Sequence, residues 1–571
     1  MSNGFVRGCG VCACVVALVG CARKDARFQD IGPVEQEFVY NSLALSPASA
    51  TGVGYHTHNG VPLDELLDDY SPSGIEAERK FYTDFRKRLE KSFQRDRLGL
   101  EARADYDIME DQIGAALLDL DTIQSYRHNP ASYVELIGNA LYAPYVLNYA
   151  PRERRFRQII ARLNKIPLLL AQAKHNLIDA PPLWTRVAAE ENDGNIALID
   201  RTLRAAAPEE VKADYNTAAA TALKALRDFN EYLKSDLVKR TYEWRLGKEV
   251  YDEKFRYTLE SGDTPDRVLK DAEAALQKIR GEMAELAKPL TVEAALNKIA
   301  RKHATPATYM ANAKRDLAGT TAFVESKKLL TLPAHDNLQV IPTPEFMRGI
   351  YSVGGFNGAP PLEPQLGAFF WITPIPATWP KDRIESKLRE YNFYGLQILT
   401  IHEAMPGHYV QMEYANRVEP PPRKMLRAVF SNTPYVEGWA VYATQLMLDQ
   451  GYLNGDPAMR LTFLKQMLRV VANAIIDIRF HTLGMTEQEA MDLMVKQTYQ
   501  EKEEATEKLQ RAEFGSCQLP TYFVGWRGWL RMRDQYERSK GGAPNLAAFH
   551  EAALRAGAVP LPWLTQLLTG K

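Results

Sequence analysis

The stretch that decides how this chain is interpreted is His402-Glu403-Ala404-Met405-Pro406-Gly407-His408. It places two imidazoles around a carboxylate, and a second acidic segment, Val436-Glu437-Gly438-Trp439-Ala440, follows about thirty residues later. Imidazole nitrogens and carboxylate oxygens are ligands that a catalytic zinc ion prefers. A carboxylate beside the first ligand can take a proton from water that the metal activates. The two segments together predict a metallohydrolase, and we expect it to be a peptidase.

The spacing of the two histidines requires a distorted helix. In the usual H-E-x-x-H helix the histidines are four residues apart on one face, whereas His402 and His408 are six apart. Six residues of an ideal helix turn a side chain by about 600°, so the two imidazoles would point apart. Pro406 lacks a backbone N–H and Gly407 tolerates unusual dihedral angles, so we expect a bulge or break that brings His408 back. The alternative is two ordinary polar histidines at a helix break.

Glu437 begins a segment that reads as a buried helix running to Leu448. An acidic side chain at the start of an apolar helix requires a helix dipole, a cation or a metal to offset its burial. We therefore expect Glu437 to bind the same ion as the histidines. Its alternative role is to cap the N-terminus of that helix.

These residues carry a family resemblance. H-E-A-x-P-G-H at 402–408 with Gln411, followed by E-G-W-A-x-Y at 437–442, resembles the bacterial domain-of-unknown-function family 885. That family is regarded as related to gluzincin-type zinc metallopeptidases with a mostly helical body. The similarity extends to 477–481, where Arg479 and Phe480 replace smaller residues, and to 520–525. It implies a large helical, metallopeptidase-like body, which we expect to enclose a deep cleft.

The resemblance and the chemistry together imply a role for each residue of the motifs. One zinc ion would be bound by His402, His408 and Glu437. Glu403 would act as general base and proton shuttle. This ligand set leaves a coordination position open, as a catalytic zinc site requires.

Three further residues in the resembling segments are candidates for the same site. Tyr522 and His481 are the candidate catalytic donors to the tetrahedral oxyanion, and packing is the alternative for each. Asp477 would orient a ligand histidine through a hydrogen bond, with a plain surface aspartate as the alternative.

Other charged residues are candidates with less support. Arg469, Arg479 and Arg527 could each anchor a peptide carboxylate through a bidentate contact, and nothing in the sequence selects among them. His56 and His58 have a metal-like spacing but lie far from the motifs, so we interpret them as structural.

The N-terminus reads as a lipoprotein signal. Arg7 precedes an apolar run at 11–20 that is too short to span a membrane, and Leu18-Val19-Gly20-Cys21 resembles the bacterial lipobox, which predicts lipidation of Cys21. Ala22 follows, where an aspartate would indicate inner-membrane retention, so the resemblance favours an outer-membrane lipoprotein facing the periplasm. The alternative is an ordinary signal peptide. Of the cysteines only Cys517 would remain unmodified, so we expect no intrachain disulfide.

Four regions are expected along the 571 residues: a signal at 1–21, a tether and extended lead-in at 22–70, a helical region at 71–330 and a catalytic region at 331–571. Apolar residues recur at three- and four-residue spacing in seven segments. These are 76–93, 98–126, 152–176, 183–206, 208–237, 264–286 and 306–328.

A small sheet is expected just before the metal-binding helix. Residues 338–342 and 366–372 read as strands, separated by a turn-rich segment at 354–361. Such a sheet edge can hold an extended peptide by backbone pairing. A mere connecting hairpin is the alternative.

The sequence therefore predicts a lipid-anchored zinc peptidase of the cell envelope, acting on peptides or oligopeptides as an exopeptidase or oligopeptidase. A net charge of −1 gives no reason to expect nucleic acid as a partner. The alternatives are a non-catalytic peptide- or partner-binding lipoprotein with a vestigial metal site, and a hydrolase of non-peptide amides.

Overall fold

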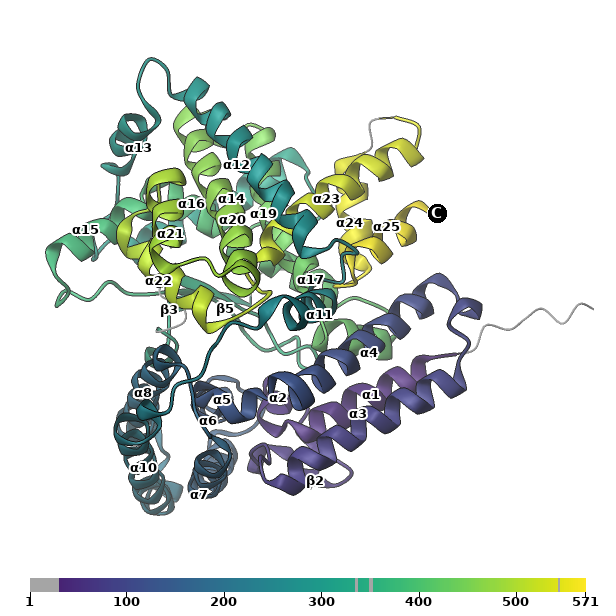
Figure 1. Ribbon diagram of the computed structural model, residues 1–571, viewed down its shortest axis with the longest axis vertical. Coiled ribbons are helices and arrows are strands. Elements are labelled where there is room, and N and C mark those ends of the chain that lie inside the picture. The colour runs from purple at the N-terminus through teal and green to yellow at the C-terminus, as the bar shows by residue number, and fades with distance from the viewer. Residues whose placement is uncertain (1–29, 334–336, 349–352, 543–544, 571) are drawn as a thin grey trace, which may run out of the picture.

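The computed structural model describes residues 30–333, 337–348, 353–542 and 545–570. It is mostly helical with a small sheet, which confirms the predicted fold class at that level (Figure 1). The predicted signal peptide and the lipobox cysteine Cys21 lie outside the described residues. Within the described residues, no helix combines the length and the apolar character needed to span a bilayer.

The predicted extended lead-in is wrong from residue 32 onward, because this part of the chain is helical. It forms α1 (Gly32–Leu45) and α2 (Pro47–Gly52). Phe38, Val39 and Leu43 have the spacing of one helical face, and all three are buried. That face packs against α18 (Pro421–Val429), so the N-terminal helices belong to the folded body.

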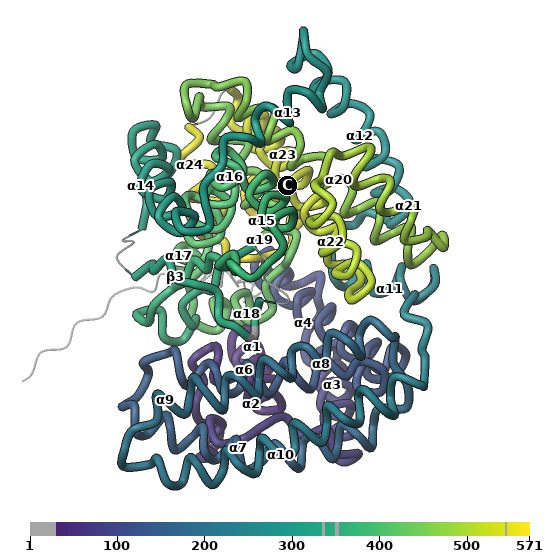
Figure 2. The backbone as a smooth tube through the Cα atoms, turned by 90° about the vertical axis from the view of Figure 1, so that its left-hand side faces the viewer, coloured from purple at the N-terminus to yellow at the C-terminus, as the bar shows by residue number. Residues whose placement is uncertain are grey.

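Three clusters of buried apolar side chains form the core of the described residues, and the smallest consists of Leu147, Phe369 and Trp371. The cluster of intermediate size lies mainly in the helices between residues 130 and 235, which gather at one end of the molecule in both views (Figures 1 and 2). The largest cluster runs from α1 to the C-terminal helices and includes the helices between residues 247 and 327. The expected boundary at residue 330 therefore does not coincide with a boundary between cores. The helices that precede the sheet are α3 (Pro72–Ser92), α4 (Leu100–Leu118), α5 (Ser125–His128), α6 (Pro130–Val146), α7 (Arg152–Asn176), α8 (Pro182–Ala197), α9 (Arg204–Ala206), α10 (Lys212–Ser235), α11 (Gly247–Leu259), α12 (Pro265–Ala287), α13 (Val292–Ala300) and α14 (Tyr309–Lys327).

The sheet before the metal-motif helix has three strands, β3 (Leu338–Pro342), β4 (Gly354–Asn357) and β5 (Ala368–Ile372), in the order β3-β5-β4. β3 is parallel to β5, so these two strands are not the hairpin considered from the sequence. β4 runs antiparallel to β5 and lies within the segment expected to be a turn. A separate ribbon of β1 (Thr57–His58) and β2 (Val61–Pro62) lies near the N-terminus.

The remaining helices follow the sheet along the chain (Figure 1). They are α15 (Lys381–Glu390), α16 (Phe393–Glu403), α17 (His408–Ala415), α19 (Thr433–Asp449), α20 (Pro457–Leu483), α21 (Glu487–Asp492), α22 (Lys502–Phe514), α23 (Pro520–Ser539), α24 (Leu546–Arg555) and α25 (Leu561–Thr569). Two of them, α16 and α17, carry the metal-motif segment.

Candidate metal centre

The helix breaks between the two histidines, as their spacing predicts. His402 lies in the last turn of α16, and His408 is the first residue of α17. Gly407 makes the connection possible, because a Cβ atom there would lie 1.9 Å from the carbonyl oxygen of His402. The chain therefore reverses tightly enough to bring the two imidazoles together, with ring centroids 4.7 Å apart.

Helix α19 presents Glu437 to this break. Its N-terminus is capped by Asn432, which accepts a hydrogen bond from the backbone N–H of Tyr435. Asn432 thus fills the capping role that was the alternative for Glu437. One turn along, the indole of Trp439 donates to the carbonyl oxygen of Pro406 at 2.8 Å. This bond ties the break between α16 and α17 to the helix that carries Glu437.

Two glycines let α19 and α23 cross closely enough to complete the site. A Cβ atom on Gly438 would lie 2.4 Å from the carbonyl carbon of Gly525, and one on Gly525 would lie 2.1 Å from the carbonyl oxygen of Pro434. Neither position has room for a side chain. The crossing places Tyr522 of α23 near His402, with ring centroids 6.4 Å apart.

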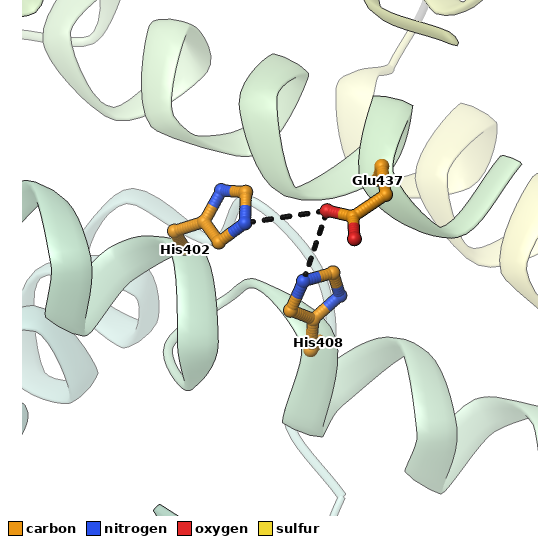
Figure 3. A group of neighbouring side chains, drawn as sticks. All are labelled: His402, His408 and Glu437. Atoms are coloured by element: carbon orange, nitrogen blue, oxygen red, sulfur yellow. Dashed lines mark ion pairs between the residues drawn. The ribbon is translucent and has the colours of Figure 1, made fainter. Parts of the chain in front are cut away.

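The three predicted ligands converge (Figure 3). Oε2 of Glu437 lies 3.5 Å from Nε2 of His402 and 3.4 Å from Nε2 of His408. The three atoms lie within 4.8 Å of one another, and this is the one such group of at least three acidic, histidine or cysteine side chains among the described residues. Tetrahedral zinc, with bonds of about 2.1 Å, separates its ligand atoms by about 3.4 Å.

The electrostatics of the group also fit a cation. Oε2 of Glu437 is buried and accepts no hydrogen bond within the described part of the chain. Burial opposes ionisation of Glu437, but the two imidazoles outweigh it and hold the pKa of the carboxyl well below its usual range. Burial likewise disfavours the His408 imidazolium, yet Glu437 and then Glu403 raise its pKa. The carboxylate of Glu437 thus favours positive charge on the two imidazoles, and a divalent ion bound between the three groups would supply that charge instead.

A cavity of about 300 Å³ adjoins the group. His402, Glu403 and Tyr522 line it, together with Gly354 of the edge strand β4. Burial and the charge of Glu437 raise the pKa of Tyr522, so its hydroxyl stays protonated and can donate. Glu403, a helical neighbour of His402, faces the same space without being one of the three converging groups.

Two of the predicted site residues are placed elsewhere. His481 is buried and is not among the residues lining the cavity. Its Nδ1 accepts from the backbone N–H of Leu246, and its Nε2 bonds the carbonyl oxygen of Gly515. Burial lowers the pKa of His481 to about 4, so the ring is neutral and ties segments together. Both ring nitrogens are therefore engaged away from the cavity, and the structure does not place His481 where the predicted donor to a substrate would lie.

Asp477 does not orient a ligand histidine. Its Oδ1 accepts from the hydroxyl of Tyr251 at 2.6 Å and from the backbone N–H of Cys517 at 3.0 Å. It is fully buried, so the surface alternative is wrong as well. Asp477 and His481 lie on one face of α20 and pack on α11, which explains why the sequence shows them at helical spacing without a catalytic function.

The contacts of the other charged candidates show which of them lie at the cavity and which are bound elsewhere. Arg479 pairs with Glu273 at 2.5 Å and Arg527 with Asp271 at 2.6 Å, and neither lines the cavity. His56 bonds Asp64 and Glu363, while His58 bonds the hydroxyl of Tyr55, so their contacts agree with a structural interpretation. Arg469 does line the cavity. Lys508 and Arg511 line it too, and the sequence offered no motif around them.

Two solved structures of bacterial proteins have a similar fold over nearly their whole length. A candidate lipoprotein of unknown function from Shewanella oneidensis is similar, with 28% sequence identity and a TM-score of 0.78 over 94% of this chain and 99% of that chain. A candidate lipoprotein from Colwellia psychrerythraea shares the fold at 17% identity, also with a TM-score of 0.78, over 95% of this chain and 98% of that chain.

The chain belongs to the family described as "Bacterial protein of unknown function (DUF885)", whose model matches residues 47–568. The family resemblance read from the motifs is thus confirmed. No curated protein matches the chain.

Proposed function

We propose that the protein is a zinc-dependent peptidase of the cell envelope that acts on peptides or oligopeptides. The observation that carries the proposal is the convergence of His402, His408 and Glu437 beside a cavity that Glu403 also lines. Two imidazoles and one carboxylate form a donor set found in catalytic zinc sites, where a coordination position stays open. A zinc ion in that place would polarise the substrate carbonyl and make water a stronger nucleophile.

The chain's own residues would perform the remaining chemistry. Glu403 accepts the proton of the attacking water and passes it to the leaving amine. The hydroxyl of Tyr522 donates to the oxygen of the attacked carbonyl. The edge strand β4, whose Gly354 lines the cavity, offers backbone groups to an extended peptide. This body and its cavity are suited to peptides, because a pocket of about 300 Å³ excludes folded chains.

The proposal includes an N-terminal lipid anchor on Cys21, with the folded body in the periplasm at the outer membrane. The lipobox-like sequence Leu18-Val19-Gly20-Cys21 supports it, and so does the fact that two structurally similar proteins are candidate lipoproteins. No nucleic acid partner is proposed, since the net charge of −1 offers no general attraction to one.

Glu403 separates the proposed activity from its alternatives. A non-catalytic envelope protein with a vestigial metal site needs the three ligands but has no use for an additional carboxylate beside them. A hydrolase of non-peptide amides would use the same residues on another substrate, and the products distinguish it.

The test compares metal content with hydrolysis in purified wild type, Glu403→Gln and Glu437→Ala. We expect about one zinc per chain in wild type and Glu403→Gln, and depletion in Glu437→Ala. Wild type should cleave members of a mixed peptide library, read by mass spectrometry, and both variants should fail. Zinc-loaded wild type that leaves the peptide library intact would contradict the peptidase proposal.

A further inference from the structure

The cavity beside the metal centre is lined by three basic side chains, two of which form no ion pair with a described residue. Arg469 of α20 and Lys508 and Arg511 of α22 line it. Lys508 and Arg511 are three residues apart on one helix, so their side chains share a face. Four carboxylates line the same cavity, namely Glu191, Glu403, Glu504 and Glu507.

Two of the four carboxylates already have cationic partners. Glu504 forms an ion pair with Arg469, and this pair is extended by the hydroxyl of Tyr391. Burial opposes the ionisation of Glu504, but Arg469 and Lys387 lower its pKa to about 2. Glu507 bonds Lys387 at 3.1 Å. Because Arg469 is paired with Glu504, it is not available to bind a substrate carboxylate, although it is the one candidate anchor from the sequence that lines the cavity.

The other two carboxylates, Glu191 and Glu403, do not neutralise the charges of Lys508 and Arg511. Burial, and then Glu135 and Glu190, raise the pKa of Glu191 to about 8, so this side chain is mostly neutral at pH 7. Glu403 is the proposed general base beside His402. Neither forms an ion pair with Lys508 or Arg511.

Lys508 is the more unusual of the two cations. It is 5% exposed, and the described residues offer it neither a hydrogen bond nor an ion pair. Burial and the positive charges of Arg469 and Arg511 lower its pKa well below the ordinary value. An ammonium group in such a place is costly unless an anion joins it.

Arg511 connects this charge to the metal centre. Its Nη2 donates to Oε1 of Gln518 at 2.9 Å and to the hydroxyl of Tyr522 at 3.3 Å. The ring centroid of Tyr522 lies 6.4 Å from that of His402. One tyrosine therefore separates Arg511 from a predicted zinc ligand, which is a separation on the scale of one substrate residue. Arg511 has no carboxylate partner among the described residues and is exposed to the cavity.

We propose that Lys508 and Arg511 bind the terminal carboxylate of the substrate, so that the protein is a carboxypeptidase. This inference rests on the proposed function. A guanidinium and an ammonium group are the natural partners of a carboxylate. With the terminus held there, the last peptide bond lies at the metal centre. Its C–N bond breaks, the oxygen of water joins the new carboxylate, and a proton passes to the released amino acid.

The experiment uses one peptide library in two forms, with free C-terminal carboxylates and with C-terminal amides. Wild type should release single C-terminal residues from the free acids, and cleave the amides roughly 10- to 100-fold less efficiently, as loss of a charged hydrogen bond predicts. Lys508→Met and Arg511→Gln should each remove most of that preference. The matched control is Lys502→Met, at an exposed position of the same helix, and it should behave as wild type.

A binding measurement separates this inference from the proposed function. Zinc-loaded Glu403→Gln, alone and combined with Lys508→Met, is mixed with each library, and retained peptides are identified after ultrafiltration. Preferential retention of free acids that Lys508→Met abolishes supports the subsite, even if wild type hydrolyses nothing. Equal retention or cleavage of acids and amides overturns the subsite and leaves the peptidase proposal standing. Retention of neither form also overturns it.

Discussion

Glu403 and Glu437 are two carboxylates near the same histidines, and their surroundings differ in a way that suits the two tasks we propose for them. Oε2 of Glu437 lies 3.4 and 3.5 Å from the two imidazoles, and this buried atom accepts no hydrogen bond from the described residues. Glu403 lines the cavity outside that group. A ligand must stay charged and fixed, whereas a proton shuttle must reach the substrate. The different positions of the two carboxylates fit this division.

At the residue scale, Glu403→Gln should therefore separate metal binding from catalysis. The amide is nearly the same size, so zinc content should be unchanged, but it cannot accept a proton. We expect kcat to fall by about 10²- to 10⁴-fold. Metal analysis beside steady-state kinetics on a cleaved peptide checks this. An active variant would place the general base on another residue.

Lys508→Met should raise the stability of the metal-free protein without ligand. In the folded state the pKa of Lys508 is lowered well below its ordinary value, so its charge opposes folding at all pH values below that ordinary value. Methionine fills similar space without the charge. We expect the free energy of unfolding in urea to increase by about 1 kcal/mol at pH 7. Lys502→Met, which is exposed, should change it little, and a destabilised Lys508→Met would show that the ammonium group has a stabilising partner.

His550 should make stability depend on pH. Its ring is buried between the hydroxyl of Tyr442 and the carbonyl oxygen of Leu329, and burial lowers its pKa to about 4. An unfolded histidine titrates near pH 6.5, so the unfolded chain gains a proton first as the pH falls from about 6.5 to 4. The stability contributed by neutral His550 is present above pH 6.5 and is lost across this window.

The measurement compares urea unfolding at pH 7 and pH 5 for wild type and His550→Gln. Wild type should lose more stability between the two pH values than the variant, by on the order of 2 kcal/mol. Because other buried groups titrate equally in both proteins, the difference isolates His550. Equal losses would mean that the ring can accept a proton in the folded state.

At the scale of elements, periodic amphipathic helices were predicted well. The segment 152–176 coincides with α7, and 264–286 differs from α12 by one residue at each end. The helix α6 was missed, because its side chains are buried on most of its surface and Pro144 interrupts the pattern. Strand β4 was missed since Gly354-Gly355 reads as a turn, while its pairing with β5 is a tertiary contact.

In the candidate site too, local features could be predicted from the sequence, whereas contacts between distant segments could not. The break at Pro406 and Gly407 and the convergence with Glu437 could be predicted, since local chemistry required them. The packing of Asp477 and His481 could not, because helical spacing does not tell which helix lies opposite. Lys508 and Arg511 carry no motif, and only the fold shows that neither forms an ion pair with a described residue.

The crossing of α19 and α23 supports a prediction of its own. Gly525→Ala would place a methyl group 2.1 Å from the carbonyl oxygen of Pro434, so the helices must separate. We expect a loss of about 1–3 kcal/mol in the free energy of unfolding and weaker zinc binding, because Glu437 moves with α19. Gly515→Ala, whose nearest neighbour would be 3.7 Å away, is the control. Unchanged zinc affinity in Gly525→Ala would show that the crossing does not position the ligand.

At the scale of the whole molecule, the N-terminal helices contribute to the site. Val187 and Glu191 of α8 line the cavity, and the indole of Trp184 on α8 donates to the carbonyl oxygen of Glu513 on α22. Both views place α8 next to α22 (Figures 1 and 2). The helical half therefore forms part of the cavity wall.

Anchoring is tested on the full-length chain. Cys21→Ser should move the protein from the membrane fraction to the soluble fraction of the envelope, because the thiol that carries lipid is lost. Hydrolysis by the released protein should be unchanged, since residue 21 lies far along the chain from the site residues. Persistence in the membrane fraction would contradict lipidation at this residue.

The central claim is that His402, His408 and Glu437 bind one zinc ion. Anomalous diffraction measured on crystals of the zinc-loaded protein, above and below the zinc absorption edge, tests it most directly. We predict a single strong peak about 2.0–2.2 Å from Nε2 of each histidine and from a carboxylate oxygen of Glu437. A crystal of zinc-loaded protein in which these three side chains surround no peak, or in which the ion lies on other residues, would contradict the account.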